Sequence, residues 1–230
     1  MDTEPRTSGG GRLFTAVAWT LVLLALWAWG VRLTGGTDDS GALAGGTRGQ
    51  LSDGRLLPPP LVPLTGAAVP LAVEIASIGV SADVIPRGVE SGGGVEPPPY
   101  EAADIAGWYE GGPSPGAAGA AVLVGHVDTE TAPAVFYGLS AVSPGSEVAV
   151  VRSDGTTATF TVERVAVVER EEFDAETVYG AHDPRRAELR LITCGGTFDR
   201  ERGTYSANVV VSAYLTGAGE AEDASGFRSV

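Results

Sequence analysis

An uncharged apolar run, Leu13–Val31, divides the chain and limits what the rest of it can fold into. With a rise of about 1.5 Å per residue, a helix of this length nearly crosses a hydrocarbon core of about 30 Å. Trp27 and Trp29 lie at the end of the run, where a cleaved signal peptide would have small residues and where a membrane interface favours tryptophan. The run therefore predicts a transmembrane anchor, with a cleaved signal peptide and a buried core helix as alternatives.

The charges beside this run slightly favour a cytoplasmic N-terminus, residues 1–12. Arg6 and Arg12 precede the run and Arg32 follows it, and the more basic flank tends to stay in the cytoplasm. We therefore expect a single-pass protein of the cell membrane whose remaining part lies outside the cell. Residues 32–68 are rich in Gly, Pro, Ser and Asp without hydrophobic periodicity, which predicts a flexible extracellular linker.

Short β-type segments separated by turn residues follow the linker and predict an all-β domain over residues 69–216. The chain contains 33 Gly and 15 Pro, which suits many turns and few long helices. We expect a mostly antiparallel sheet that closes into a small barrel. Residues 217–230 are acidic and rich in small residues, so a disordered tail is expected there. The segments expected to form strands are 70–89, 120–126, 146–152, 157–169, 188–194 and 205–215.

The charge balance and the few metal-ligating residues exclude several classes of function. The formal net charge is −14, so the chain repels phosphates and no nucleic acid is expected as a partner. Cys194 is the only cysteine, which excludes an intramolecular disulfide and a zinc site built on thiolates. With only two histidines, we predict neither a metal nor a cofactor. His182 lies in a polar, turn-like stretch and is expected to be a solvated loop residue.

Two apolar strand candidates end in residues that support nucleophilic chemistry. The segment AVLVGH ends at His126, and LRLITC ends at Cys194, just before Gly195 and Gly196. An imidazole beside a thiol supplies a charge that favours the thiolate and passes a proton to a leaving amine. The residues alone leave two interpretations open: a catalytic pair, or a buried cysteine and a structural histidine.

The motifs around these two residues resemble those of sortases, and most closely those of the class F group. The matching segments are VLVGHVDT, AVFYGL, LITCGGTFD and ANVVVSAY, and the resemblance extends from Val69 to about Leu215. It implies an eight-stranded barrel in which the Cys194 thiolate attacks the Thr–Gly bond of an LPXTG-type sorting signal. A thioester would form and pass to an amine of a cell-wall precursor, with His126 as general acid and then general base.

Sortases generally have an arginine near the start of the strand after the cysteine, and this chain departs from that pattern. Its strand reads TYSANVVV, in which Asn208 falls at or near the arginine position and offers a hydrogen-bond donor without a charge. Arg202 and Arg200, in FDRERG, are alternatives that would fold back over the site, or else solvated loop charges. The candidate catalytic set is therefore Cys194, His126, Asn208 and Arg202.

Two neighbours of the candidate pair are weaker candidates. Thr193 precedes the cysteine and offers a hydroxyl, or is a plain strand residue. Asp128 lies two residues beyond His126, a spacing that in an extended strand puts both side chains on one face. It is a candidate to orient the imidazole unless the strand has already ended.

Two other functions compete with the transpeptidase. The first is a membrane-tethered β-barrel that binds sorting signals or a surface protein without turnover, which the missing arginine favours. The second is another thiol enzyme of the cell wall, such as an L,D-transpeptidase. Those enzymes have His and Cys in one compact motif, whereas His126 and Cys194 are far apart in this sequence.

Overall fold

The computed structural model describes residues 51, 54–91, 93–200 and 203–221 of the 230-residue chain. The apolar run Leu13–Val31, Arg202 and most of the predicted tail lie outside these ranges, so those predictions stay untested. Among the residues that the structure describes, no helix is long and apolar enough to cross a membrane.

Eight strands make up the described fold, and five short helices connect them. The helices are η1 (Ala76–Ile78), η2 (Tyr100–Ala102), η3 (Leu139–Ala141), η4 (Arg170–Glu172) and α2 (Ala175–Tyr179). The strands are β1 (Pro70–Ile75), β2 (Val80–Arg87), β3 (Ala106–Tyr109), β4 (Gly119–Val124), β5 (Glu147–Arg152), β6 (Thr156–Glu169), β7 (Ala187–Asp199) and β8 (Thr204–Glu220).

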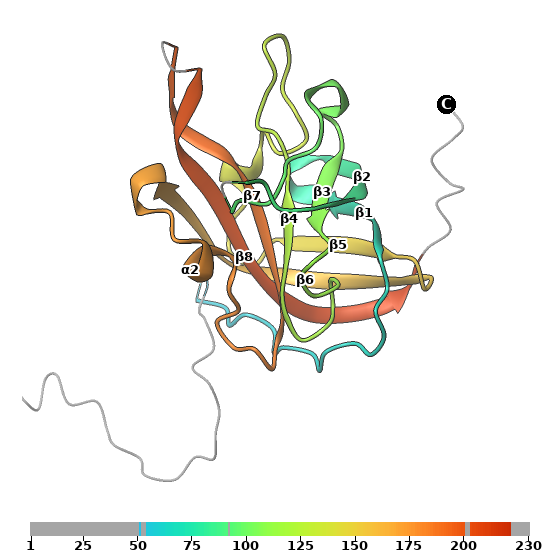
Figure 1. The fold of residues 1–230 in the computed structure, drawn as a ribbon. Coiled ribbons are helices and arrows are strands. Elements are labelled where there is room, and N and C mark those ends of the chain that lie inside the picture. The colour runs from blue at the N-terminus through green and yellow to red at the C-terminus, as the bar shows by residue number, and fades with distance from the viewer. Residues whose placement is uncertain (1–50, 52–53, 92, 201–202, 222–230) are drawn as a thin grey trace, which may run out of the picture. The chain divides into compact units, whose positions relative to one another are not determined.

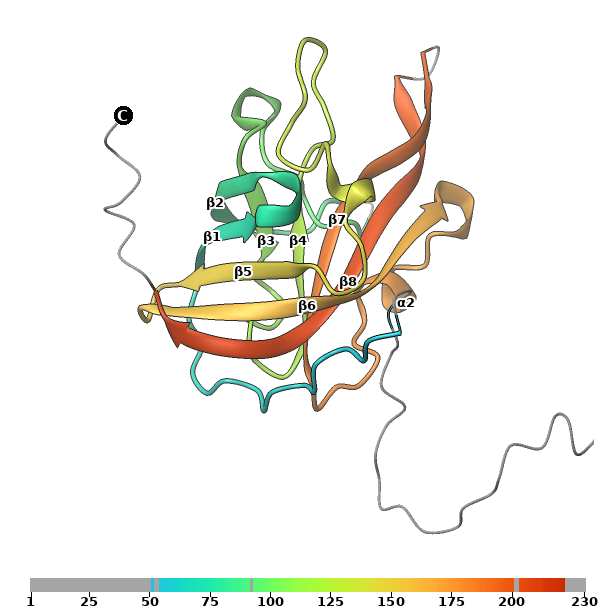
Figure 2. The same ribbon diagram turned by 180° about the vertical axis from the view of Figure 1, so that it is seen from behind.

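These strands form a closed barrel in the order β1-β2-β3-β4-β7-β8-β6-β5, which confirms the predicted all-β barrel. Most neighbouring strands are antiparallel, as expected, but the β2–β3 and β4–β7 pairs are parallel. Figures 1 and 2 show the long strands β6, β7 and β8 side by side, with the β7–β8 hairpin extending beyond the rest of the sheet.

Alternation of side chains along β7 explains how one strand serves both the core and the outer surface. Leu189 and Leu191 point into the barrel and are fully buried in its core. Arg190, between them, and Ile192, after them, point outward. Ile192 packs in a second apolar cluster on the outer face with Val124, Val210 and Val178 of α2. This period of two continues to the polar end of the strand, where it decides which face each reactive residue occupies.

The segment from residue 54 to residue 68 is held against the barrel, which differs from the flexible linker expected over residues 32–68. The Leu61 and Leu64 amides donate to the carbonyl oxygens of Leu215 and Gly116, both at 2.8 Å. Leu57 is buried, and Leu64 packs on the core. These leucines recur within a proline-rich stretch and lack the period of a helix or strand, so the sequence pattern concealed their burial.

Strand β8 also continues past the predicted end of the domain at residue 216. Residues 217–220 pair with residues 156–159 of β6. The glycine and alanine content that suggested disorder is tolerated because β6 supplies a complete row of backbone partners there.

Candidate active site

The parallel β4–β7 pair brings the predicted reactive residues to one edge of the sheet. Val124 pairs with Ile192 in register, and the Gly125 amide donates to the Ile192 carbonyl oxygen at 3.1 Å. His126 and Cys194 each lie two residues beyond this pair. Because parallel strands advance together, both residues follow Val124 and Ile192 on the outer face of the barrel.

His126 is buried beneath the segment that precedes η2. Its Nε2 lies 2.7 Å from the Pro98 carbonyl oxygen, and its ring stacks on Tyr100 with centroids 4.3 Å apart. A carbonyl oxygen only accepts, so Nε2 donates and carries the proton. Nδ1 is therefore the ring nitrogen that gains and loses a proton. Neither Pro98 nor Tyr100 was predicted as part of the site, because both are distant in sequence from His126.

Gly125 makes this placement of His126 possible. A Cβ atom at residue 125 would lie 2.6 Å from Val135 Cγ1 and 2.7 Å from Phe136 Cδ2. Phe136 is fully buried, and its amide donates to the His126 carbonyl oxygen at 3.0 Å. The glycine therefore lets the chain turn from β4 onto the core directly before the histidine.

Cys194 is exposed at the edge of the outer face. Loss of water on the protein side of the thiol raises the pKa of Cys194 above its usual value of 9.0, Arg170 opposes this rise, and Asp128 adds to it. The side chain is accessible to a substrate and is chiefly a neutral thiol near neutral pH. A proton acceptor is therefore needed to generate the nucleophile.

Asn208 lies directly across from Cys194 on β8, as the position of the missing strand arginine suggested. On the other side, Asn208 pairs with Val168 of β6. Residues directly opposite in antiparallel strands have side chains on the same face, so the Asn208 amide is next to the thiol. Thr193 points the other way: it is buried, and its hydroxyl has no hydrogen-bond partner in the described part of the chain.

Asp128 has a different partner from the one considered from its spacing. The Tyr205 hydroxyl donates to Asp128 Oδ2, and this bond raises the pKa of Tyr205 to about 12. Tyr205 is the second residue of β8, three residues before Asn208. The carboxylate therefore ties the loop after His126 to β8 and adds a negative charge near Cys194. The partner residue is 77 positions away in the sequence, which spacing rules do not reach.

The two loop arginines considered from sequence differ from Arg170 in position. Arg200 follows the last residue of β7, six residues beyond Cys194, or roughly 20 Å along an extended strand. Arg202 lies outside the described residues. Arg170, at the start of η4, acts on the thiol electrostatically. It was overlooked because a charged residue after a strand normally indicates a solvated surface.

Gly195 and Gly196 are required by packing behind the cysteine. A Cβ atom at residue 195 would lie 2.6 Å from Val209 Cγ2. Gly196 has φ +77°, and a Cβ atom there would overlap the Ser206 hydroxyl. The β7–β8 register shifts between Gly195 and Phe198. The glycine pair therefore forms a β-bulge directly after Cys194, which re-aims the end of the strand.

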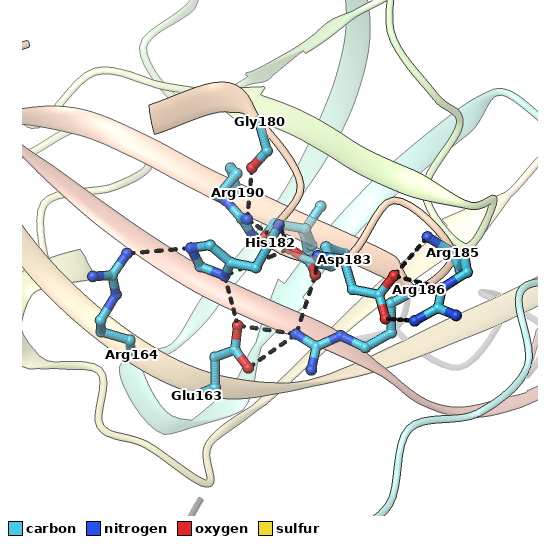
Figure 3. Close-up of polar contacts among 10 residues, drawn as sticks. Glu163, Arg164, Gly180, His182, Asp183, Arg185, Arg186 and Arg190 are labelled. Carbon is cyan, nitrogen blue, oxygen red and sulfur yellow. Dashed lines mark hydrogen bonds and ion pairs between the residues drawn. The ribbon is translucent and has the colours of Figure 1, made fainter. Parts of the chain in front are cut away.

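A second polar cluster lies on the same outer face, about 20 Å along β7 from Cys194. Figure 3 shows His182 between Glu163 and Arg164, with Arg186 reaching the same glutamate. Glu163, His182 and Glu188 have ligand atoms within 4.8 Å of one another. Their carboxylates are already engaged: Arg186 bonds both Glu163 oxygens, at 3.0 and 3.1 Å.

Glu188 is the buried member of this cluster. Arg190 donates to it at 2.6 Å, and the backbone amides of His182 and Asp183 donate at 3.0 Å. Burial alone would raise the pKa of Glu188, but these donors outweigh it and lower the pKa. The arginines already neutralise both glutamates, so the cluster is an ion-pair network that holds the loop before β7. His182 belongs to this network, where a solvated loop residue was expected.

A family model described as a sortase domain matches residues 73–216, the whole barrel except its first and last few residues. No curated protein sequence matched the chain. Among solved structures, sortase C-1 from Actinomyces oris is similar, with 22% identity, TM-score 0.48, and coverage of 64% of this chain and 73% of that one. The Listeria monocytogenes sortase A is 18% identical, with TM-score 0.49 and coverage of 69% and 93%.

Proposed function

The chain belongs to the sortase family of cysteine transpeptidases, and from this premise we propose that it cleaves an LPXTG-type sorting signal between Thr and Gly. The threonine acyl group released from the signal then passes to an amine of a cell-wall precursor. Cys194 is the nucleophile and His126 the acid–base group. The observation that carries the proposal is the parallel β4–β7 register, because it places His126 and Cys194 each two residues beyond the paired Val124 and Ile192.

The reaction begins with transfer of the Cys194 proton to His126. The Pro98 carbonyl keeps a proton on Nε2, so the incoming proton binds Nδ1 and produces an imidazolium. Tyr100 covers one face of the ring, which fixes the plane in which Nδ1 points. No carboxylate is needed to select the tautomer, since a backbone carbonyl does so.

Acylation forms the thioester. The thiolate Sγ attacks the carbonyl carbon of the threonine, a C–S bond forms, and the carbonyl oxygen becomes an oxyanion. When this intermediate collapses, the C–N bond breaks and the glycine nitrogen takes the proton from His126 Nδ1. The C-terminal fragment departs as a neutral amine, and the N-terminal part stays on Cys194.

Transfer reverses the proton path. The acceptor nitrogen attacks the thioester carbonyl, gives its proton to His126 Nδ1, and displaces Sγ as a thiolate. In both steps the Asn208 side-chain amide, opposite Cys194, is a neutral donor available to the developing oxyanion. Loss of one such donor typically slows an enzyme by about 10²- to 10³-fold.

The proposed membrane topology and the proposed class F assignment rest on the sequence. The uncharged run Leu13–Val31 supports a single-pass anchor with the barrel outside the cell. The motifs LITCGGTFD and VLVGHVDT support the class F group. Protease treatment of intact cells should degrade the barrel if it is exposed on the outer surface, and protection in intact cells would contradict this topology.

A transfer assay with the reduced full-length enzyme tests the proposed chemistry. A labelled LPXTG peptide and a short glycine peptide should yield one ligated product, joined through the threonine carbonyl. Cys194→Ala should abolish the product, and His126→Ala should reduce the rate by at least about 10²-fold. A peptide in which the Thr-Gly order is reversed is the control substrate. Product from Cys194→Ala, or no product from the parent with several sorting signals, would contradict the proposal.

A further inference from the structure

The strand that follows the nucleophile brings no cation to the thiol. Strand β8 reads TYSANVVVSAYLTGAGE, without a lysine or arginine. In β7 the one arginine, Arg190, is buried and bound to Glu188 at 2.6 Å, four residues before Cys194. Any cation that assists a developing oxyanion must therefore come from another element.

The three-strand register points to that element. Cys194 pairs with Asn208, and Asn208 pairs with Val168, so the three form one row across β7, β8 and β6. Their side chains share the outer face. Arg170 is two residues beyond Val168, at the point where β6 ends and η4 begins. Strand β6 ends at Glu169, so alternation stops before Arg170, and the contact made by its side chain decides which face it occupies.

A contact with β8 fixes where the guanidinium lies. Arg170 Nη1 donates to the Thr204 hydroxyl. Thr204 and Asn208 are four residues apart on β8, so both side chains lie on the face of Cys194. The guanidinium thus lies over the start of β8, on the face that carries Asn208 and Cys194. Arg170 and Cys194 are both exposed.

We propose that Arg170 is a catalytic residue that donates to the carbonyl oxygen of the scissile bond and stabilises its oxyanion. This inference rests on the proposed transpeptidation. Arg170 then supplies a charged donor to the oxyanion, and the Asn208 amide supplies a neutral one. A guanidinium offers several N–H donors, so the Thr204 contact leaves others for the substrate.

The thiol provides an independent electrostatic sign of this placement. The Arg170 charge lowers the pKa of Cys194, against burial and the Asp128 carboxylate, which both raise it. The groups that interact electrostatically with the thiol are thus Arg170 from η4, Asp128 from the loop after β4, and Tyr205 from β8. Removal of Arg170 leaves burial and Asp128 unopposed, so the alkylation midpoint of Cys194 should rise.

The test compares Arg170→Ala with three variants of the full-length enzyme. We expect kcat/KM for transfer to fall about 10²- to 10³-fold in Arg170→Ala. In Arg170→Lys, kcat/KM should fall less, because lysine keeps the charge but lacks the paired N–H donors of the guanidinium. Thr204→Val should lose at most about tenfold, since the guanidinium stays on the same face. Arg185→Ala removes a largely exposed arginine that is paired with Asp183 on a distant loop, and should change nothing.

The outcomes separate this inference from the proposed function. A loss below about threefold in Arg170→Ala, or an equal loss in Thr204→Val, would overturn the role of Arg170. A large loss in Arg202→Ala but not in Arg170→Ala would do the same. If the parent enzyme transfers nothing, the proposed function fails. The position of Arg170 is then tested by the pH dependence of iodoacetamide alkylation of Cys194. An unchanged midpoint in Arg170→Ala would overturn the proposed role of Arg170.

Discussion

At the scale of the residue, Cys194 is held in a balance of opposing charges. Burial and Asp128 raise the pKa of its thiol and Arg170 lowers it. The net rise in the pKa of Cys194 disfavours the thiolate. The proposed reaction therefore depends on a proton acceptor for the thiol, the role proposed for His126.

Replacement of Asp128 by Asn should make the thiol more acidic. An asparagine oxygen still accepts from the Tyr205 hydroxyl, so the contact is retained while the negative charge is removed. The pKa of Cys194 falls, and iodoacetamide alkylation at pH 8 should accelerate. The pKa of Tyr205, now about 12, should also fall in an ultraviolet titration.

The matched control for this substitution is Glu130→Gln, which removes an exposed carboxylate two residues away in the same loop. Its alkylation profile should match that of the parent. An alkylation midpoint that is unchanged or higher in Asp128→Asn would contradict the electrostatic account of the thiol.

At the scale of the element, the β-bulge after Cys194 sets the direction of the β7–β8 hairpin. Gly196→Ala forces φ +77° on an alanine and drives its Cβ against Ser206 and Ala207. We expect the free energy of unfolding to fall by about 2–4 kcal/mol, from the backbone strain and the overlap together. Transfer activity should fall as well, because Cys194 is two residues away.

Gly203→Ala is the matched control in the same hairpin. Gly203 also has a positive φ, +63°, but nothing lies within 4 Å of a Cβ atom there. Only backbone strain destabilises this variant, so its free energy of unfolding should fall by about 1–2 kcal/mol. It should keep its activity. Urea denaturation compares the two, and equal losses of stability would show that the bulge is not tightly packed.

The sequence predicted most of the strands but did not predict which strands pair with one another. Alternating apolar residues and the Asp154–Gly155 turn predicted β5, β6 and the hairpin between them. The apolar strand ends at His126 and Cys194 predicted where to look for chemistry. The parallel β4–β7 pairing that aligns them is a long-range choice of the whole sheet, which local patterns do not encode.

Residues that act through long-range contacts were correspondingly missed. Arg170 is a surface charge by its sequence context, and only the fold shows that it follows the Val168–Asn208 pair and bonds Thr204 of β8. Pro98 and Tyr100 read as loop residues until His126 is packed beneath them. The family pattern directed attention to Asn208 on β8, and only the three-strand row shows which neighbouring element brings a cation.

At the scale of the whole molecule, the segment from residue 54 to residue 68 is part of the folded unit. Its backbone bonds join it to β8 and to the loop before β4, and the Tyr214 hydroxyl donates to the Pro58 carbonyl oxygen at 2.7 Å. Residues 54–68 were expected to belong to a flexible linker, and the structure instead holds them on the barrel.

Two adjacent leucines test whether residues 54–68 stabilise the barrel. Leu57 is 6% exposed and Leu56 is 58% exposed, so they differ in burial while sharing their chemistry and position in sequence. Leu57→Ala should lower the free energy of unfolding by about 2–4 kcal/mol, whereas Leu56→Ala should change it by less than about 0.5 kcal/mol. Similar small effects in thermal denaturation would mean that the segment does not stabilise the barrel.

The central claim is that Cys194 carries the acyl group between the two half-reactions. Intact-mass spectrometry of the reduced enzyme, mixed with an LPXTG peptide and no amine, tests it most directly. We expect an adduct equal to the peptide up to its threonine, mapped to Cys194, released by hydroxylamine and absent in Cys194→Ala. An adduct on another residue, or turnover of the peptide by the Cys194→Ala variant, would contradict it.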